Sequence, residues 1–183
     1  DTLKIDANGG WKIDEALQVS EASRDVHVLF EQPCRTYEGC RAFKESTGRP
    51  MALDESIHDM ADLLRAHQDR VLDVLNVKIG RVGGLSRARE MRDLCVRLGI
   101  RMYIQDTSGG EFNAAGIVHL AHSTPEGFLL SMWDCADLQT TQIGMGLLRD
   151  HPSHVHVVRA NTKPGLGVEP LMDVLGEPVA VYA

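Results

Sequence analysis

The sequence has no long hydrophobic run and no excess of positive charge. No uninterrupted apolar stretch approaches the roughly 18–20 residues of a membrane-spanning helix, and no signal peptide opens the chain. The net charge of −7 argues against a general surface for nucleic acid or anionic membranes. We therefore expect a cytoplasmic protein that binds neither nucleic acid nor membrane.

The cysteines lack the paired spacing of a zinc finger. The chain has only four, at positions 34, 40, 95 and 135. In a chain of 183 residues that is 43% hydrophobic and 25% charged, an ordinary globular composition, such scattered cysteines indicate reduced core thiols rather than a disulfide framework.

What the sequence does contain is a repeated interval between charged residues. Asp6, Glu31 and Asp54 each end a short apolar run, at separations of 25 and 23 residues, and Lys78 ends another run 24 residues further on. Strand, turn and helix together take roughly 25–30 residues in a parallel α/β barrel. The interval predicts a TIM-type barrel with these four side chains at the C-terminal ends of successive strands, where such barrels carry their active sites.

Six strands can be counted, with helices expected between them. The strands are expected near 3–5, 28–30, 51–53, 75–77, 101–104 and 128–131. A closed eight-stranded barrel needs ~250 residues, so the chain is either part of a longer protein or an open sheet. Beyond residue 135 the alternation fades, with one short helix expected around 144–148 and an apolar run at 155–158.

Three acids and a lysine at one edge favour a hard cation beside a proton-transfer group. Carboxylate oxygens are ligands that Mg²⁺ prefers, and Mn²⁺ is the alternative. Any one acid at a strand end is more often a helix cap or a solvated charge, and it is the set of three in phase, each followed by a turn signal, that favours a metal site. Lys78, desolvated near a cation, fits a general base of lowered pKa, although a lysine whose stem lies along the apolar surface explains it equally well. Glu55 and Asn8 are expected to lie beside the metal ligands and hold them in place without binding the metal themselves.

A second group of residues is expected to contact substrate. The segment 105–111 ends a strand with Gly109-Gly110, whose backbone N–H groups suit an anionic group. In this segment Asp106 either orients Lys78, contacts substrate or caps a helix, and Ser108 is a candidate substrate contact. Trp133 follows the last strand and fits either a cationic substrate ammonium or ordinary core packing.

Several of these strings together resemble the mandelate racemase/muconate lactonizing enzyme branch of the enolase superfamily. They are Ile5-Asp6-Ala7-Asn8-Gly9-Gly10-Trp11, Phe30-Glu31-Gln32-Pro33, Leu53-Asp54-Glu55-Ser56, Val77-Lys78 with Gly83-Gly84-Leu85, and Pro164-Gly165-Leu166-Gly167-Val168. Within the branch, Glu31-Gln32-Pro33-Cys34 and the segment 119–125 are most similar to hydroxyproline-type dehydratases and proline-betaine epimerases.

The resemblance implies that Asp6, Glu31 and Asp54 bind Mg²⁺ and that Lys78 is an acid/base catalyst. A base would remove the proton α to a substrate carboxylate, and the cation would stabilise the enediolate. This intermediate would then either regain a proton, which gives epimerisation, or expel a β-hydroxyl group, which gives dehydration. The chain would be a C-terminal barrel domain, residues 1–183, holding strands three to eight. The N-terminal lid domain, the first two strands and a second acid/base lysine would lie outside it.

Three interpretations stay open on the sequence alone. The first is a metal-dependent enzyme, with a dehydratase of a hydroxy (amino) acid such as cis-3-hydroxyproline placed before a racemase or epimerase. The second is a non-catalytic metal-binding barrel, and the third is an open α/β sheet with incidental acids. In the first, we expect a small carboxylate substrate and a homo-oligomer, with residues 1–183 inactive alone. Similar members carry tryptophan where this chain has Ser108, so their substrates do not transfer directly.

Overall fold

The computed structural model describes residues 3–107, 109–135, 138–149 and 158–181. Ser108 and most of the apolar run at 155–158 lie outside the described residues. The chain divides into two compact units. The first comprises Asp1–Val77 and Glu90–Tyr103, and the second comprises Lys78–Arg89 and Ile104–Ala183. No helix among the described residues is long and apolar enough to cross a membrane.

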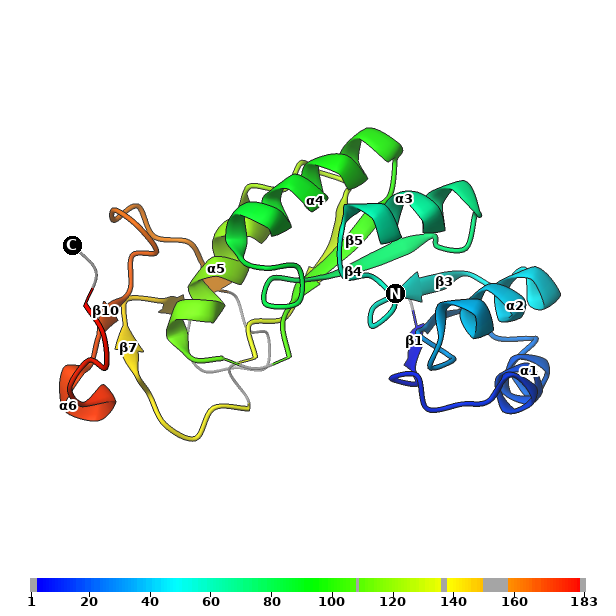
Figure 1. Ribbon diagram of the computed structural model, residues 1–183, viewed down its shortest axis with the longest axis horizontal. Helices are drawn as coiled ribbons and strands as arrows, with labels where there is room; N and C mark the ends of the chain where they lie inside the picture. Colours follow the sequence, from blue (N-terminus) through cyan, green and yellow to red (C-terminus); the bar gives the residue numbers. More distant parts are fainter. Residues whose placement is uncertain (1–2, 108, 136–137, 150–157, 182–183) are drawn as a thin grey trace. The chain divides into compact units, whose positions relative to one another are not determined.

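Strand and helix alternate along the first unit, and Figure 1 follows them from blue to green. The elements are β1 (Leu3–Asp6), α1 (Ile13–Ala22), β2 (Val28–Glu31), α2 (Tyr37–Thr47), β3 (Met51–Leu53), α3 (Met60–Gln68), β4 (Val74–Lys78), α4 (Leu85–Leu98) and β5 (Arg101–Gln105), of which β4, α4 and β5 continue into the second unit. The predicted alternation through residue 105 is confirmed.

The strands of the sheet are neighbours in chain order, from β1 to β6 (Leu129–Met132). Strands β1 and β2 are parallel, with Asp6 opposite Glu31. The next two pairs are also parallel, β2 with β3 and β3 with β4. Each parallel step needs a crossover, and the intervening helices supply it. The acids that end β1 and β2 therefore lie on adjacent strands at one edge of the sheet.

Local signals fix the helix ends of the first unit. Thr36 Oγ1 accepts a hydrogen bond from Gly39 N at 3.1 Å, and Asp59 Oδ1 accepts from Ala61 N at 2.8 Å. These are N-caps, which satisfy backbone donors that a helix leaves unpaired. Helix α2 ends at Gly48, whose φ of 62° suits glycine. Thr36 and Gly48 therefore bound α2, and Asp59 starts α3.

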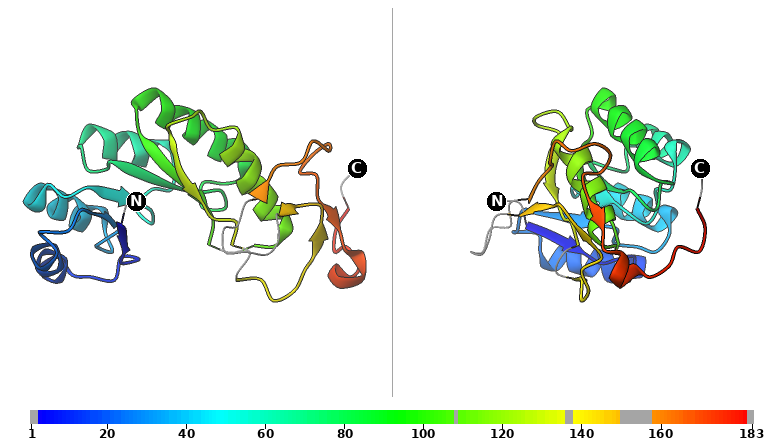
Figure 2. Two further views of the ribbon diagram at one scale, coloured as in Figure 1. Left: turned by 180° about the vertical axis from the view of Figure 1, so that it is seen from behind. Right: turned by 90° about the vertical axis from the view of Figure 1, so that its left-hand side faces the viewer.

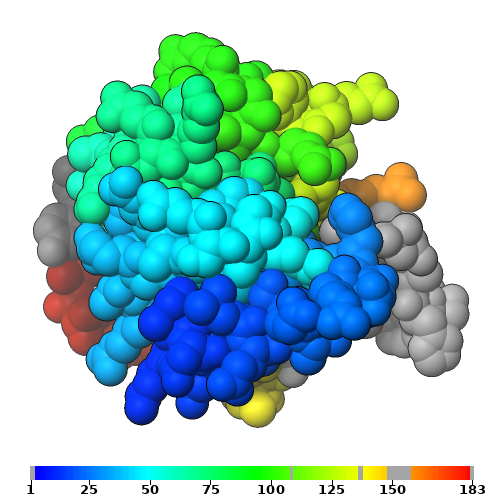
Figure 3. All heavy atoms as spheres, turned by 90° about the vertical axis from the view of Figure 1, so that its right-hand side faces the viewer, coloured from blue at the N-terminus to red at the C-terminus, as the bar shows by residue number. Residues whose placement is uncertain are grey.

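The core of the first unit lies between strands and helices. Phe30 of β2 and Phe43 of α2 are fully buried, with ring centroids 5.0 Å apart. The space-filling view in Figure 3 shows α1 and α2 in blue and cyan as a continuous surface, consistent with their direct packing.

All four cysteines are free and buried, and burial raises the pKa of the Cys95 thiol to about 12. The prediction of reduced core thiols is confirmed.

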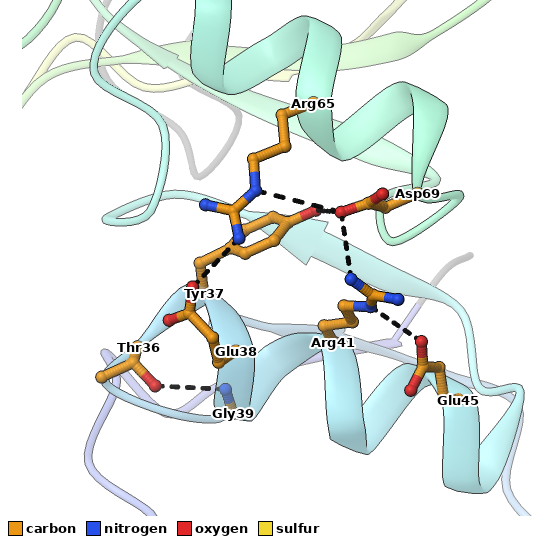
Figure 4. Close-up of polar contacts among 8 residues, drawn as sticks. All are labelled: Thr36, Tyr37, Glu38, Gly39, Arg41, Glu45, Arg65 and Asp69. Carbon is orange, nitrogen blue, oxygen red and sulfur yellow. Dashed lines mark hydrogen bonds and ion pairs between the residues drawn. The ribbon is translucent and has the colours of Figure 1, made fainter.

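A polar network joins α2 to the end of α3 (Figure 4). Tyr37 Oη donates a hydrogen bond to Asp69 Oδ2 at 2.7 Å. The Arg65 guanidinium lies 4.1 Å from the centroid of the Tyr37 ring, and Arg41 approaches Asp69 at 3.5 Å. The half-buried tyrosine is thus held from its edge and from its face.

The second unit contains α5 (Glu111–His122), β6 and four two-residue strands, seen from behind in Figure 2. These strands are β7 (Gly144–Met145), β8 (Leu148–Arg149), β9 (Val158–Arg159) and β10 (Glu169–Pro170), paired β7 with β10 and β8 with β9, before the short helix α6 (Met172–Leu175). The helix predicted around 144–148 is wrong. Gly146 has a φ of 126°, which no helix accommodates, and Gly144 pairs with Pro170 across β7 and β10.

Candidate active site

Asp6 is the last residue of β1 and is followed by a tight turn. Its carboxylate is exposed, and Oδ1 accepts a hydrogen bond from Asn8 N at 2.9 Å. Asn8 has a φ of 47°, and Gly9 after it has a φ of 68°. A Cβ at Gly9 would lie 3.1 Å from Arg35 Cα, so the glycine permits the close approach of two backbone segments. Asn8 therefore lies in the turn that holds one oxygen of Asp6, and its supporting role at a metal site stays a prediction.

Glu31 stands opposite Asp6 and is fully buried. Its Oε1 accepts a hydrogen bond from Asn76 Nδ2 on β4 at 2.5 Å, and its Oε2 forms an ion pair with Lys4 of β1. Burial raises the pKa of the Glu31 carboxyl above its usual range, and the hydrogen bond and charge of Lys4 oppose that rise. The buried carboxylate on β2 thus takes its two polar partners from β1 and β4.

Asp54 follows β3 and is held through its backbone by Gln32. The Gln32 Oε1 accepts hydrogen bonds from Asp54 N at 3.1 Å and Ser56 N at 3.2 Å. Its Nε2 donates to Cys34 O at 2.9 Å and to Ser56 Oγ at 2.6 Å. Gln32 is fully buried and Asp54 is 1% exposed. One amide side chain therefore fixes the chain beyond β2 against the chain beyond β3, with half-buried Glu55 next to Asp54.

In the second unit, Lys78 ends β4 and Asp106 holds the turn that follows it. Lys78 is 8% exposed and Asp106 is 7% exposed. Asp106 Oδ2 accepts a hydrogen bond from Gly80 N at 2.6 Å, and Oδ1 accepts from Thr107 N at 2.8 Å. A Cβ at Gly80 would lie 3.1 Å from Asp106 Oδ2, so this contact favours glycine. Asp106 thus ties the turn beyond Lys78 to the end of β5, and its role toward Lys78 or substrate stays a prediction.

Of the two predicted substrate contacts, Trp133 lies within the described residues and Ser108 does not. Trp133 is half-buried, and its backbone N donates to Ile104 O at 3.1 Å. Glu111, the first residue of α5, is 7% exposed and accepts a hydrogen bond from Ile143 N at 3.0 Å through Oε2. Glu111 also lines a polar cavity of about 330 Å³ in the second unit, together with Gln139, Thr140, Thr141, Gln142, Gly144, Gly146 and Leu147. None of the sequence patterns indicated this cavity.

The chemistry of the three acids fits a hard divalent cation. All three present oxygen ligands, and two of them are directly opposite on adjacent parallel strands. The fully buried Glu31 carboxylate already has one cationic partner, Lys4, and burying a charge without such a partner would be costly. As the side chains stand, no three His, Cys, Asp or Glu groups within the described parts of the chain are gathered as a metal site. The metal-binding trio stays a prediction.

Three residues of this region were not recognised as functional from the sequence. Lys4, Gln32 and Asn76 lie in or beside strands that were interpreted as apolar runs. The available signal was a polar side chain within a buried strand, because such a group needs a specific partner. In the structure each of them contacts a predicted ligand or its backbone.

The fold and the strand-end acids define a class: a parallel α/β domain of the (β/α) barrel type with carboxylates at the C-terminal ends of its strands. The family model described as Enolase C-terminal domain-like matches residues 1–174. The chain belongs to this family, as the strand-end motifs predicted.

Known proteins resemble the chain along its whole length. A cis-3-hydroxy-L-proline dehydratase of Roseibium aggregatum is 43% identical over 184 residues, covering 100% of this chain and 49% of that protein. The crystal structure of a mandelate racemase/muconate lactonizing enzyme from Roseovarius nubinhibens ISM matches with a TM-score of 0.90 and 36% identity, covering 100% of this chain and 49% of the other.

A further solved structure is a member of the enolase superfamily from Roseovarius nubinhibens ISM complexed with magnesium. It matches with a TM-score of 0.89 and 32% identity, covering 99% of this chain and 48% of the other. The chain therefore spans about half the length of the proteins it matches. These similarities confirm the predicted partial barrel and the predicted branch of the superfamily.

Proposed function

We propose that the complete protein in which residues 1–183 occur removes the proton α to the carboxylate of a small hydroxy amino acid and then expels a β-hydroxyl group. The observation that carries this proposal is the placement of acids at the C-terminal ends of three consecutive strands, with Asp6 directly opposite Glu31. The full-length similarity to a cis-3-hydroxy-L-proline dehydratase supports cis-3-hydroxyproline as the substrate.

Asp6, Glu31 and Asp54 would hold Mg²⁺, with Mn²⁺ as the alternative. When bound, the divalent cation neutralises the negative charge that develops as the α-proton leaves. Support comes from the donor set and from the residues that hold it: Asn76 fixes one Glu31 oxygen, and Gln32 fixes the Asp54 backbone. A magnesium complex of a similar enolase-superfamily protein supports the choice of ion.

Lys78 would accept the α-proton at Nζ. Lys78 ends β4 and is buried there, and an amine at that position can act as a general base. The Cα–H electron pair would first be taken up by the carboxylate and would then form the C=C bond as the Cβ–O bond breaks. The hydroxyl group would leave as water, with its proton supplied by the second acid/base group, which is expected outside residues 1–183. Asp106 would hold the Gly80 turn beyond Lys78, while Trp133 and Ser108 would contact substrate.

The rest of the activity would need the part that residues 1–183 do not cover in their relatives. We expect that part to supply two strands, a lid and the second acid/base group, and we expect the complete protein to form a homo-oligomer. The strand order leaves β1 at an end of the sheet, and an unpaired strand edge needs cover.

The test uses the complete protein with Mg²⁺ and cis-3-hydroxy-L-proline in D₂O, followed by ¹H NMR. A dehydratase consumes the substrate and forms a dehydrated product. An epimerase instead inverts the α-carbon and introduces deuterium without loss of water. Failure to exchange the α-proton across a panel of hydroxy amino acids, amino acids and betaines would favour a non-catalytic metal-binding barrel.

A further inference from the structure

Lys4 lies on the same face of β1 as the predicted ligand Asp6, because side chains two residues apart on a strand point the same way. Its ammonium pairs with Glu31 Oε2 and lies 4.6 Å from the centroid of the Tyr103 ring on β5. The Lys4 side chain is 30% exposed, whereas that of Glu31 is fully buried. The lysine is thus held between a buried carboxylate and an aromatic face.

The arrangement compensates an unfavourable burial. A carboxylate removed from water is stable as an anion only if it is paired and hydrogen-bonded. Among the described residues, Glu31 has two such partners, the Asn76 amide and the Lys4 ammonium. Only Lys4 brings a full positive charge. The Tyr103 ring favours a cation over its face and so helps to keep the ammonium in place.

The same charge has a second consequence at a predicted metal ligand. A divalent cation bound by Glu31 meets the Lys4 ammonium at the same carboxylate. Two cations at one carboxylate repel each other, and this repulsion is weakly screened at a buried group. Lys4 therefore stabilises Glu31 before a metal binds and opposes the metal afterwards.

We propose that Lys4 is a built-in counter-ion of Glu31, which stabilises the protein without divalent metal and weakens its affinity for Mg²⁺. The inference rests on the proposed metal site. It assigns Lys4 a positioning and affinity-setting role, with no contact to substrate.

The experiment compares Lys4→Met and Lys4→Arg in the complete protein. Methionine keeps an unbranched chain against Tyr103 without the charge, and arginine keeps the charge. In EDTA, the thermal midpoint of Lys4→Met should fall by several degrees. By isothermal titration, its Kd for Mg²⁺ should be about tenfold lower than that of wild type. Lys4→Arg should resemble wild type in both measurements.

Lys163→Met is the matched control, since it removes an exposed ion pair with Glu169 in the second unit. It should leave the Kd for Mg²⁺ unchanged. A Kd that is unchanged or raised in Lys4→Met would overturn the counter-ion role while leaving the metal site intact. Absence of Mg²⁺ binding by wild type would overturn the proposed metal site as well.

A double variant covers the case in which Lys4→Met does not fold. Glu31→Gln removes the charge that Lys4 compensates, so Lys4→Met combined with Glu31→Gln should fold and should melt close to Glu31→Gln alone. If the double variant melts well below Glu31→Gln alone, Lys4 stabilises the barrel by packing and the proposal fails.

Discussion

Gln32 fixes the backbone of Asp54, through a hydrogen bond from Asp54 N to Gln32 Oε1 at 3.1 Å. Gln32→Leu would leave this N–H and that of Ser56 buried without their acceptor. We expect a loss of about 3 kcal/mol in the free energy of unfolding, since each unsatisfied buried group costs roughly 1–3 kcal/mol.

Chemical denaturation of the complete protein measures this loss, with exposed Gln18→Leu on α1 as the control. The displaced Asp54 should also raise the Kd for Mg²⁺ at least several-fold. A Gln32→Leu protein as stable as Gln18→Leu would show that the amide does not hold the strand ends together.

Asp54→Asn tests the ligand role of the third acid. The amide keeps the size of the side chain but lacks the negative charge, so we expect it to abolish most of the thermal protection given by Mg²⁺. Asp25→Asn, at a side chain that is 91% exposed, is the charge-matched control and should keep the full protection. Thermal scans with and without Mg²⁺ measure both; equal protection of the two variants would exclude Asp54 as a ligand.

Gly80→Ala tests the contact between Asp106 and the turn beyond Lys78. The added Cβ would lie 3.1 Å from Asp106 Oδ2 and displace either the carboxylate or the turn. We expect kcat for α-proton exchange to fall at least tenfold with little change in the Kd for Mg²⁺, because Lys78 and not the metal ligands is disturbed.

Gly116→Ala makes the same substitution inside α5, where its Cβ would meet Ile79 Cδ1 at an ordinary 3.6 Å. It should retain activity. If Gly80→Ala is as active as Gly116→Ala, the Asp106 contact does not position the base.

Tyr37 gives a prediction about pH. Burial, together with the hydrogen bond to Asp69, raises the pKa of the Tyr37 phenol above its usual value. The folded protein therefore keeps this proton at pH values where the unfolded chain loses it. The stability that the phenol contributes is present below about pH 10 and is lost as the pH rises further.

Tyr37→Phe removes this contribution, about 1–2 kcal/mol for a hydrogen bond to a charged group. Its thermal midpoint should lie below that of wild type at pH 7, and the difference should shrink above pH 10. In an Asp69→Ala background the difference should nearly vanish at both pH values. A difference that does not change with pH would indicate lost packing instead.

Much of the first unit could be predicted from the sequence because its signals are local. Asp6 and Glu31 end β1 and β2, and Asp54 directly follows β3, as the repeated interval predicted. The parallel order followed, because each strand is joined to the next by a helix.

The polar partners inside the strands could not be found in this way. Lys4 and Asn76 interrupt runs that otherwise appear apolar. Each has a role only through its contact with Glu31, which lies 27 and 45 residues away in the sequence, respectively. Beyond residue 135, strands of two residues are too short to show a period, and the glycines at 144 and 146 were interpreted as a helix.

The central claim is that Asp6, Glu31 and Asp54 bind one divalent ion together. Crystals of the complete protein soaked in Mn²⁺ test it most directly through anomalous diffraction. The account predicts a single strong manganese peak within coordination distance of carboxylate oxygens from all three residues. A peak that omits any of the three, or no peak at this edge of the sheet, would contradict it.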